Sequence, residues 1–161
     1  MSNTLKSFFV AATRQNDGKT MTSLGLFSAI LKRFKKVAYM KPVGQQYLVV
    51  DDKKVDKDAV LFQHVYDLKD DFSHMSPIAV PKGFTQDYID QPDNERAKKV
   101  LQESHSKLIQ DKDFLVVEGT GHAGVGSVFD LSNAAVAKLL RLKVILVSLG
   151  GIGRSIDELM L

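Results

Sequence analysis

The chain has 161 residues, of which 44% are hydrophobic and 25% charged, with no cysteine and a formal net charge of +3. This composition is typical of one folded domain with a substantial core, and it argues against disorder. Disulfides and thiolate metal sites are excluded, and apolar runs fall short of the ~20 residues that span a bilayer. No signal-peptide pattern opens the chain, so we expect a cytoplasmic protein.

The first predicted elements are a strand at residues 6–12 and a helix at about residues 19–33. The polar segment between them, residues 13–20, reads T-R-Q-N-D-G-K-T. In a phosphate-binding loop with these neighbours, backbone N–H groups and the helix N-terminus surround a polyphosphate. We therefore predict a nucleoside triphosphate site. The loop residues assigned to it are Thr13, Asn16, Asp17, Gly18, Lys19 and Thr20.

Two side chains of this loop carry its chemistry. Lys19 adds a positive charge beside the phosphates, and Thr20 offers a hydroxyl to Mg2+. The usual pattern G-x-x-x-x-G-K-[ST] is incomplete, because Thr13 stands where its first glycine belongs. The prediction therefore depends on the intact triplet Gly18-Lys19-Thr20 between a strand and a helix.

A second strand is predicted at residues 36–40, and Lys41 follows it directly. Pro42 favours an extended conformation at Lys41. A lysine so placed can direct its ammonium at a phosphate or a substrate carboxylate, or it can be a solvated lysine at a strand end; the residues alone leave both open. The basic residues just before this strand suit the end of a helix, and Phe34 is the single aromatic residue among them, so we expect no nucleic-acid partner and no membrane.

The next predicted helix covers residues 56–66, with Ala59, Val60, Phe62 and Val65 able to share one face. Asp58 lies in its first turn, where a carboxylate is stabilised by the helix dipole. Spacing alone gives Asp58 no further role.

The remaining segments complete an alternating pattern. Residues 76–83 contain two prolines and are predicted to form an ordered loop. Helices are expected at residues 94–110 and 132–140, and nearly all-apolar strands at residues 114–117 and 144–147. This order predicts an α/β fold, a mostly parallel open sheet with helices on both faces and ligands at the carboxyl ends of the strands.

The chain ends at Leu161, a few residues into another predicted helix that begins near Arg154. Such a helix normally returns to a further strand. We therefore expect residues 1–161 to be a single P-loop nucleotide-binding domain that lacks its C-terminal part.

Glu118 comes directly after an apolar strand and precedes a glycine-rich segment, G-T-G-H-A-G-V-G-S. A carboxylate at this position can hold Mg2+ directly or through water, or it can cap its own loop. The backbone N–H groups of Gly119 and Gly121 can approach an anion. His122 could contact phosphate or transfer a proton, but a hydrogen bond within the loop is the alternative.

Together these segments resemble the dethiobiotin synthetase superfamily of P-loop enzymes. This superfamily also includes cobyrinic acid amide synthases and the ATPase-like N-terminal domain of some phosphotransacetylases. The resemblance covers nearly the whole chain. Its parts are F-F-V-A-A-T-R-Q-N-D-G-K-T (8–20), Y-M-K-P-V-G (39–44), K-D-A-V-L (57–61), S-P-I-A-V-P (76–81) and V-V-E-G-T-G (116–121).

The resemblance implies roles for single residues. Lys19 would bind the phosphates, Lys41 would contact the substrate or the transferred phosphoryl group, and both would be catalytic. The residues implied to hold Mg2+ are Thr20, Asp58 and Glu118. The implied enzyme is a homodimeric ATP-dependent C–N ligase, a cyclo-ligase as in biotin biosynthesis, that activates a carboxylate or carbamate by phosphoryl transfer before a nitrogen attacks.

The chain departs from the dethiobiotin synthetase pattern mainly on the substrate side. Ala12 stands where glycine is usual, and Gly44-Gln45-Gln46 follow K-P-V where a serine is usual. The segment E-G-T-G-H replaces E-G-A-G-G. We therefore expect ATP and Mg2+, with a small carboxylate or amine substrate left open. The alternatives are a regulatory ATP-binding module like the phosphotransacetylase N-terminal domain and a cobyrinic acid amide synthase-like enzyme.

Overall fold

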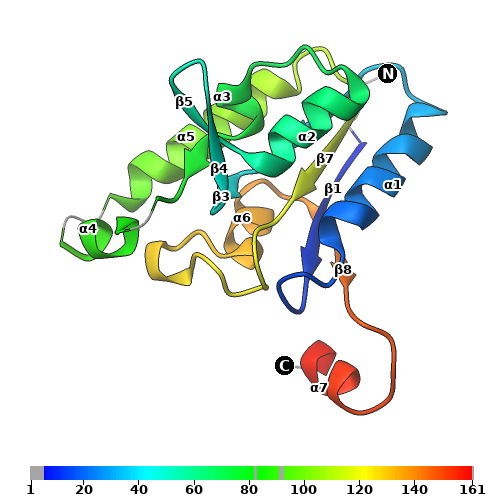
Figure 1. The fold of residues 1–161 in the computed structure, drawn as a ribbon, viewed down its shortest axis with the longest axis vertical. Coiled ribbons are helices and arrows are strands. Elements are labelled where there is room, and N and C mark those ends of the chain that lie inside the picture. The colour runs from blue at the N-terminus through cyan, green and yellow to red at the C-terminus, as the bar shows by residue number, and fades with distance from the viewer. Residues whose placement is uncertain (1–5, 82, 91–92, 161) are drawn as a thin grey trace.

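A computed structural model describes residues 6–81, 83–90 and 93–160 (Figure 1). Its centre is a parallel sheet with the order β2-β7-β1-β8. The four strands are β1 (Lys6–Ala12), β2 (Val37–Met40), β7 (Phe114–Glu118) and β8 (Lys143–Val147). The predicted α/β class with a mostly parallel sheet is confirmed.

Helices lie on both faces of this sheet, with α1 and α2 on one side and α5 and α6 on the other (Figure 1). The α-helices are α1 (Lys19–Leu31), α2 (Lys57–Tyr66), α3 (Phe72–Met75), α4 (Phe84–Asp90), α5 (Asn94–Leu108), α6 (Asn133–Leu139) and α7 (Arg154–Met160), and η1 (Ser127–Phe129) is a 3-10 helix. Within the described ranges, no helix combines the length and apolarity needed to cross a bilayer.

Two small strand pairs stand beside the central sheet. Strand β3 (Val43–Gly44) pairs in parallel with β6 (Ile78–Ala79), so the predicted loop at residues 76–83 contains a short strand. Strands β4 (Tyr47–Val50) and β5 (Lys53–Asp56) form an antiparallel hairpin that the sequence reasoning missed. The hairpin leads directly into α2 and thereby fixes where that helix begins.

The register of the central sheet brings distant residues to one edge. Val10 of β1 lies beside Glu118 of β7, and Met40 of β2 lies beside Val117. Lys41 therefore leaves β2 next to Glu118. Because all the strands are parallel, the phosphate-loop segment that follows β1 starts from the same edge.

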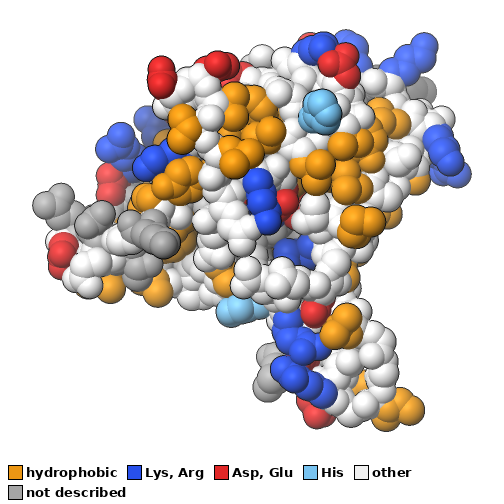
Figure 2. Space-filling view, viewed as in Figure 1, with side chains coloured by type: hydrophobic (Ala, Val, Ile, Leu, Met, Phe, Trp, Pro, Cys, Tyr) orange, Lys and Arg blue, Asp and Glu red, His pale blue; other side chains and the backbone are white. Residues whose placement is uncertain are grey.

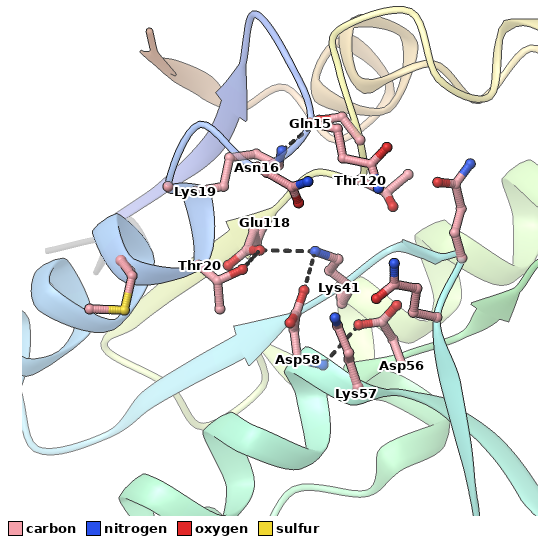
Figure 3. A pocket seen from close by; sticks show the side chains of 15 residues that line it. Gln15, Asn16, Lys19, Thr20, Lys41, Asp56, Lys57, Asp58, Glu118 and Thr120 are labelled. Atoms are coloured by element: carbon pink, nitrogen blue, oxygen red, sulfur yellow. Dashed lines mark hydrogen bonds and ion pairs between the residues drawn. The ribbon is translucent and has the colours of Figure 1, made fainter. Parts of the chain in front are cut away.

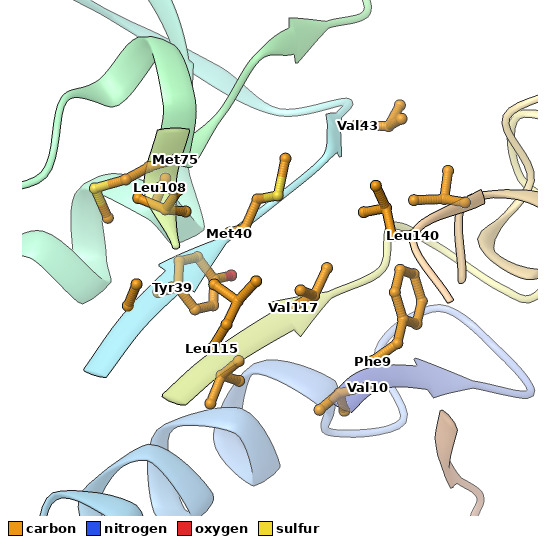
Figure 4. Packing of buried hydrophobic residues seen from close by; sticks show 14 of the residues in the cluster. Phe9, Val10, Tyr39, Met40, Val43, Met75, Leu108, Leu115, Val117 and Leu140 are labelled. Atoms are coloured by element: carbon orange, nitrogen blue, oxygen red, sulfur yellow. The ribbon is translucent and has the colours of Figure 1, made fainter. Parts of the chain in front are cut away.

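The core fills both faces of the sheet (Figure 4). On the face covered by α1 and α2, the Tyr39 ring stacks on Phe62 with centroids 3.7 Å apart, and Phe27 meets Phe62 edge-on. Val65 was predicted to share this buried face of α2, but it is 51% exposed. The prediction for Val65 is wrong because the narrow buried stripe of α2 is formed by Ala59 and Phe62, three residues apart.

Replacing Phe62 with alanine should destabilise the fold by about 3–5 kcal/mol, since the ring is fully buried between Tyr39 and Phe27. Urea unfolding followed by circular dichroism measures this loss. Val65→Ala on the exposed side of α2 is the control and should change the free energy of unfolding by less than about 0.5 kcal/mol. Equal losses for the two variants would contradict the described packing.

Candidate functional site

A cavity of about 240 Å³ opens at the carboxyl edge of the central sheet (Figure 3). It lies between the phosphate loop, the ends of β2 and β7, and the first turn of α2. On the face seen in Figure 2, basic and acidic side chains lie close together in the middle of the molecule, with apolar side chains on both sides. The lining residues are Gln15, Asn16, Gly18, Lys19, Thr20, Met21, Lys41, Gln45, Gln46, Asp56, Lys57, Asp58, Glu118, Thr120 and Gly121.

The phosphate loop has the conformation that its sequence requires. Gly18 has a φ of 90° and directly precedes α1, and Asn16 is also left-handed with a φ of 69°. Because Gly18 has no side chain to cap the helix, the first N–H groups of α1 remain available for an anion. This is the arrangement in which a helix N-terminus binds phosphate.

Thr13, which stands in place of the first glycine of the usual pattern, stabilises the phosphate loop through two hydrogen bonds. Its hydroxyl donates to Asp17 Oδ2 at 3.1 Å, and its N–H donates to the Val147 carbonyl at 3.1 Å. The first bond closes the phosphate loop across its base, and the second attaches the loop to β8. Neither Thr13 nor Asp17 lines the cavity, so these two residues support the loop from behind.

Lys19 is 7% exposed, and its Nζ donates to the carbonyl of Gly121 at 2.5 Å. Burial lowers the pKa of Lys19 below its usual 10.5, and the positive charge of Lys41 lowers it further. Its hydrogen-bond acceptor is a neutral carbonyl, so a phosphate would provide a negatively charged partner for the ammonium. The Lys19 side chain is therefore placed to bind an anion in the cavity.

Lys41 occupies the centre of the charged cluster. Its Nζ donates to Asp58 Oδ2 at 2.7 Å and to Glu118 Oε1 at 2.9 Å. Burial lowers the pKa of Lys41, but the charges of Glu118 and Asp58 outweigh it and raise the pKa above its usual 10.5. The alternative of a solvated strand-end lysine is wrong, since Lys41 is only 4% exposed.

Glu118 is fully buried at the end of β7. Its Oε1 accepts hydrogen bonds from Thr20 Oγ1 at 3.0 Å and from Lys41, while its Oε2 is buried and forms no well-aligned hydrogen bond with the described residues. Beneath it, burial raises the pKa of the Tyr39 hydroxyl well above its usual 10, and the charge of Glu118 adds to the effect. Tyr39 therefore stays neutral.

Asp58 reaches the cavity because of how α2 begins. Asp56 is the N-cap residue, and its Oδ1 accepts from the Asp58 N–H at 2.9 Å. The Lys57 N–H donates to the Gln46 carbonyl at 2.8 Å, which attaches the helix start to the hairpin. Burial raises the pKa of Asp56 above its usual 3.8, against the opposing charge of Lys41.

The residues predicted to hold Mg2+ lie together and fit a cation. Thr20, Asp58 and Glu118 surround one positive group, and Glu118 Oε2 is a buried oxygen with a free lone pair. Within the described chain, no cluster of three or more His, Cys, Asp or Glu side chains could hold a metal alone. A cation here would complete its coordination with water and phosphate oxygens, as Mg2+ commonly does.

The glycine-rich loop after β7 is fixed by a residue that sequence reasoning missed. Asn133 Oδ1 accepts from the Thr120 N–H at 3.0 Å, and its Nδ2 donates to the carbonyls of Thr120 at 2.9 Å and His122 at 2.8 Å. A Cβ at Gly119 would lie 2.5 Å from Asn133 Oδ1, so this position requires glycine. Gly119 thus supports the loop without lining the cavity.

His122 forms the local hydrogen bond that was one of its two predicted roles. Its Nδ1 accepts from the Gly124 N–H at 3.2 Å, and its side chain is exposed.

A contact also links the phosphate loop to α7: Arg14 Nε lies 3.0 Å from Glu158 Oε2. This pair anchors the C-terminal helix of Figure 1 beside residues 13–20.

Several residues of the cavity wall were not predicted. Gln45 and Gln46 follow β3, Asp56 and Lys57 join the hairpin to α2, and Thr120 lies in the glycine-rich loop. The sequence offered a partial signal, since Gln45 and Gln46 stand where the family pattern has a different residue type. Their common location depends on the hairpin, which was missed.

The phosphate loop, the parallel sheet and the charged cluster at its carboxyl edge define a P-loop nucleotide-binding domain. The chain belongs to the AAA domain family, whose sequence model matches residues 6–161.

Curated relatives carry the name ATP-dependent dethiobiotin synthetase. The chain is 32% identical over 117 residues to BioD 2 of Salmonella typhimurium. The aligned region covers 73% of this chain and 49% of that protein. The chain is 25% identical over 156 residues to BioD of Clostridium kluyveri, covering 92% of this chain and 64% of that protein. The chain therefore spans about half to two-thirds of the length of these relatives.

A plasmid partition protein from Borrelia burgdorferi B31, solved bound to AMPPNP, has a similar fold. The TM-score is 0.55 with 12% sequence identity, covering 97% of this chain and 67% of that one. This likeness supports the fold alone.

Replacing Asn133 with alanine should destabilise the protein by at least about 1–3 kcal/mol, because buried polar groups of Thr120 and His122 lose their partners. Chemical unfolding measures the loss. The control is Ser127→Ala, which removes an exposed hydrogen bond to Gly124 in the same loop and should cost less. A neutral Asn133→Ala would show that the loop does not depend on this side chain.

Proposed function

We propose that the protein is a Mg-ATP-dependent ligase of the dethiobiotin synthetase type. The observation that carries this proposal is the single cavity in which Lys19 and Thr20 of the phosphate loop meet Lys41, Asp58 and Glu118. The names of the curated relatives support the same class of reaction. Gln45 and Gln46 line the cavity, and we infer from them that the substrate would differ in detail from that of the relatives.

The proposed nucleotide-binding residues lie in two loops, the phosphate loop that begins at Thr13 and the glycine-rich loop after β7. Asn16, Gly18, Lys19 and Thr20 would contact phosphates, with Gly121 opposite, while Thr13, Asp17 and Gly119 would hold the two loops in shape. When bound through Thr20, Asp58 and Glu118, Mg2+ would neutralise charge on the phosphate oxygens. These three residues are proposed to orient it.

The proposed reaction has two steps. A carboxylate or carbamate oxygen of the substrate attacks the γ-phosphorus of ATP, and the bond to the β–γ bridging oxygen breaks, which releases ADP and leaves a mixed anhydride. A nitrogen then attacks the activated carbon, loses a proton and expels phosphate. Lys19 would stabilise charge on the phosphoryl group, and Lys41 would do so once its ammonium faces the cavity.

Lys19→Ala should weaken ATP binding about tenfold or more, because a buried charge-assisted contact to phosphate is lost. Calorimetry with Mg-ATP measures the affinity. Lys32→Ala, which removes an exposed lysine at the end of α1, is the matched control and should bind ATP normally. An unchanged affinity in Lys19→Ala would remove the nucleotide site from this loop.

The ligase itself is tested by ADP release from Mg-ATP with and without diaminopelargonate and bicarbonate, with Lys19→Ala as the blank. Stimulation by the two substrates would support the ligase. ATP binding without stimulation would contradict dethiobiotin synthesis and favour another carboxylate substrate or a regulatory role.

We also propose that the protein is a homodimer, because enzymes of the type it resembles commonly place the substrate at a subunit interface. Light scattering on the purified protein should give twice the mass of one chain. A strictly monomeric mass across the accessible concentration range would overturn this proposal.

A further inference from the structure

A cation already stands where the proposed metal would bind. The ammonium of Lys41 lies 2.7 Å from Asp58 Oδ2 and 2.9 Å from Glu118 Oε1, and the Thr20 hydroxyl shares the second oxygen at 3.0 Å. Of the three residues proposed to bind the metal, Asp58 and Glu118 contact the Lys41 nitrogen, and Thr20 contacts Glu118 beside it. Figure 3 shows Lys41 extending between the two carboxylates.

Burial explains why this lysine is needed. The side chains of Lys41 and Glu118 are 4% and 0% exposed, and that of Asp58 is 13% exposed. Two carboxylates withdrawn from water in this way are strongly unfavourable unless a positive group pairs with them. Lys41 provides that charge.

A divalent cation that binds Asp58 Oδ2 and Glu118 Oε1 would compete with Lys41 for these oxygens. Mg2+ held by these carboxylates would strongly repel a neighbouring ammonium. Asp58 Oδ2 and Glu118 Oε1 are the two oxygens that Lys41 already uses. These two oxygens together therefore pair with one cation at a time.

We propose that Lys41 is an exchangeable counter-ion, which pairs with Asp58 and Glu118 and is displaced from them when a divalent cation binds. This inference rests on the proposed function, because that function supplies the metal. Displacement frees the Lys41 ammonium to face the cavity only when the metal is present. The lysine that would stabilise the transferred phosphoryl group is thereby withheld until the metal is in place.

The cavity contains a matched control. Lys57 also lines it, but its side chain is exposed and its ammonium forms no ion pair with any residue that the structure describes. Substituting Lys57 removes the same charge from the same cavity without releasing a carboxylate. Any effect of net charge alone appears in both variants, whereas displacement affects Lys41 only.

The experiment is a calorimetric titration of MgCl2 into the nucleotide-free protein, into Lys41→Met and into Lys57→Met. Lys41→Met should bind Mg2+ about tenfold or more tightly than the unmodified protein, because no charge-assisted hydrogen bond has to be broken first. Lys57→Met should stay within about twofold. Equal or weaker binding by Lys41→Met, an equal change in both variants, or no Mg2+ binding by any of them would overturn the inference.

A second measurement needs no variant and covers the case in which Lys41→Met does not fold. The unmodified protein is labelled with an amine-acetylating reagent with and without Mg2+, and each lysine is quantified by mass spectrometry. Mg2+ should increase the labelling of Lys41 and leave that of Lys57 unchanged. Unchanged or reduced labelling of Lys41 would overturn the inference.

The two proposals fail separately. Substrate-stimulated ADP release together with unchanged Mg2+ affinity in Lys41→Met would retain the ligase and reject the exchange. Tighter Mg2+ binding in Lys41→Met without ADP release would retain the exchange and reject the ligase.

Discussion

The site depends on one buried carboxylate at the end of a central strand. Glu118 has no exposure to solvent, and an unpaired carboxylate in that position would cost several kcal/mol. Its partners are Lys41, 77 residues earlier, and Thr20, 98 residues earlier. Both reach it because β7 lies between β1 and β2, so that the segments following those two strands converge on its end. The order of three strands thus determines the electrostatics of the cavity.

The central sheet could be predicted because its strands are short apolar runs followed by glycine, proline or polar residues. The hairpin β4–β5 could not be recognised in the same way, since Lys53 and Lys54 are exposed and the apolar run before them does not alternate. A local signal was nevertheless present. Asp51 and Asp52 have φ values of 46° and 60°, which a two-residue hairpin turn requires and which aspartate tolerates.

The site was predictable where a residue follows a strand or opens a helix, as Lys19, Lys41 and Glu118 do. The contacts among these residues were not, because the distance from Lys41 to Asp58 depends on the path of the hairpin. Asn133 could not be predicted either, because it begins a helix and belongs to no sequence motif. Its side chain nevertheless holds the loop whose Gly121 carbonyl accepts the hydrogen bond from Lys19. Local patterns therefore identify the charged groups, and tertiary packing decides what each one touches.

The hairpin joins two parts of the cavity wall. It begins directly after Gln46, a cavity-wall residue, and ends at Asp56, which caps α2 and thereby positions Asp58. The attachments at this end use main-chain groups: the Gln46 carbonyl accepts from the Lys57 N–H, and the Asp56 N–H donates to Ser76 Oγ. The side chains of Gln45 and Gln46 can therefore change without moving the Asp58 carboxylate.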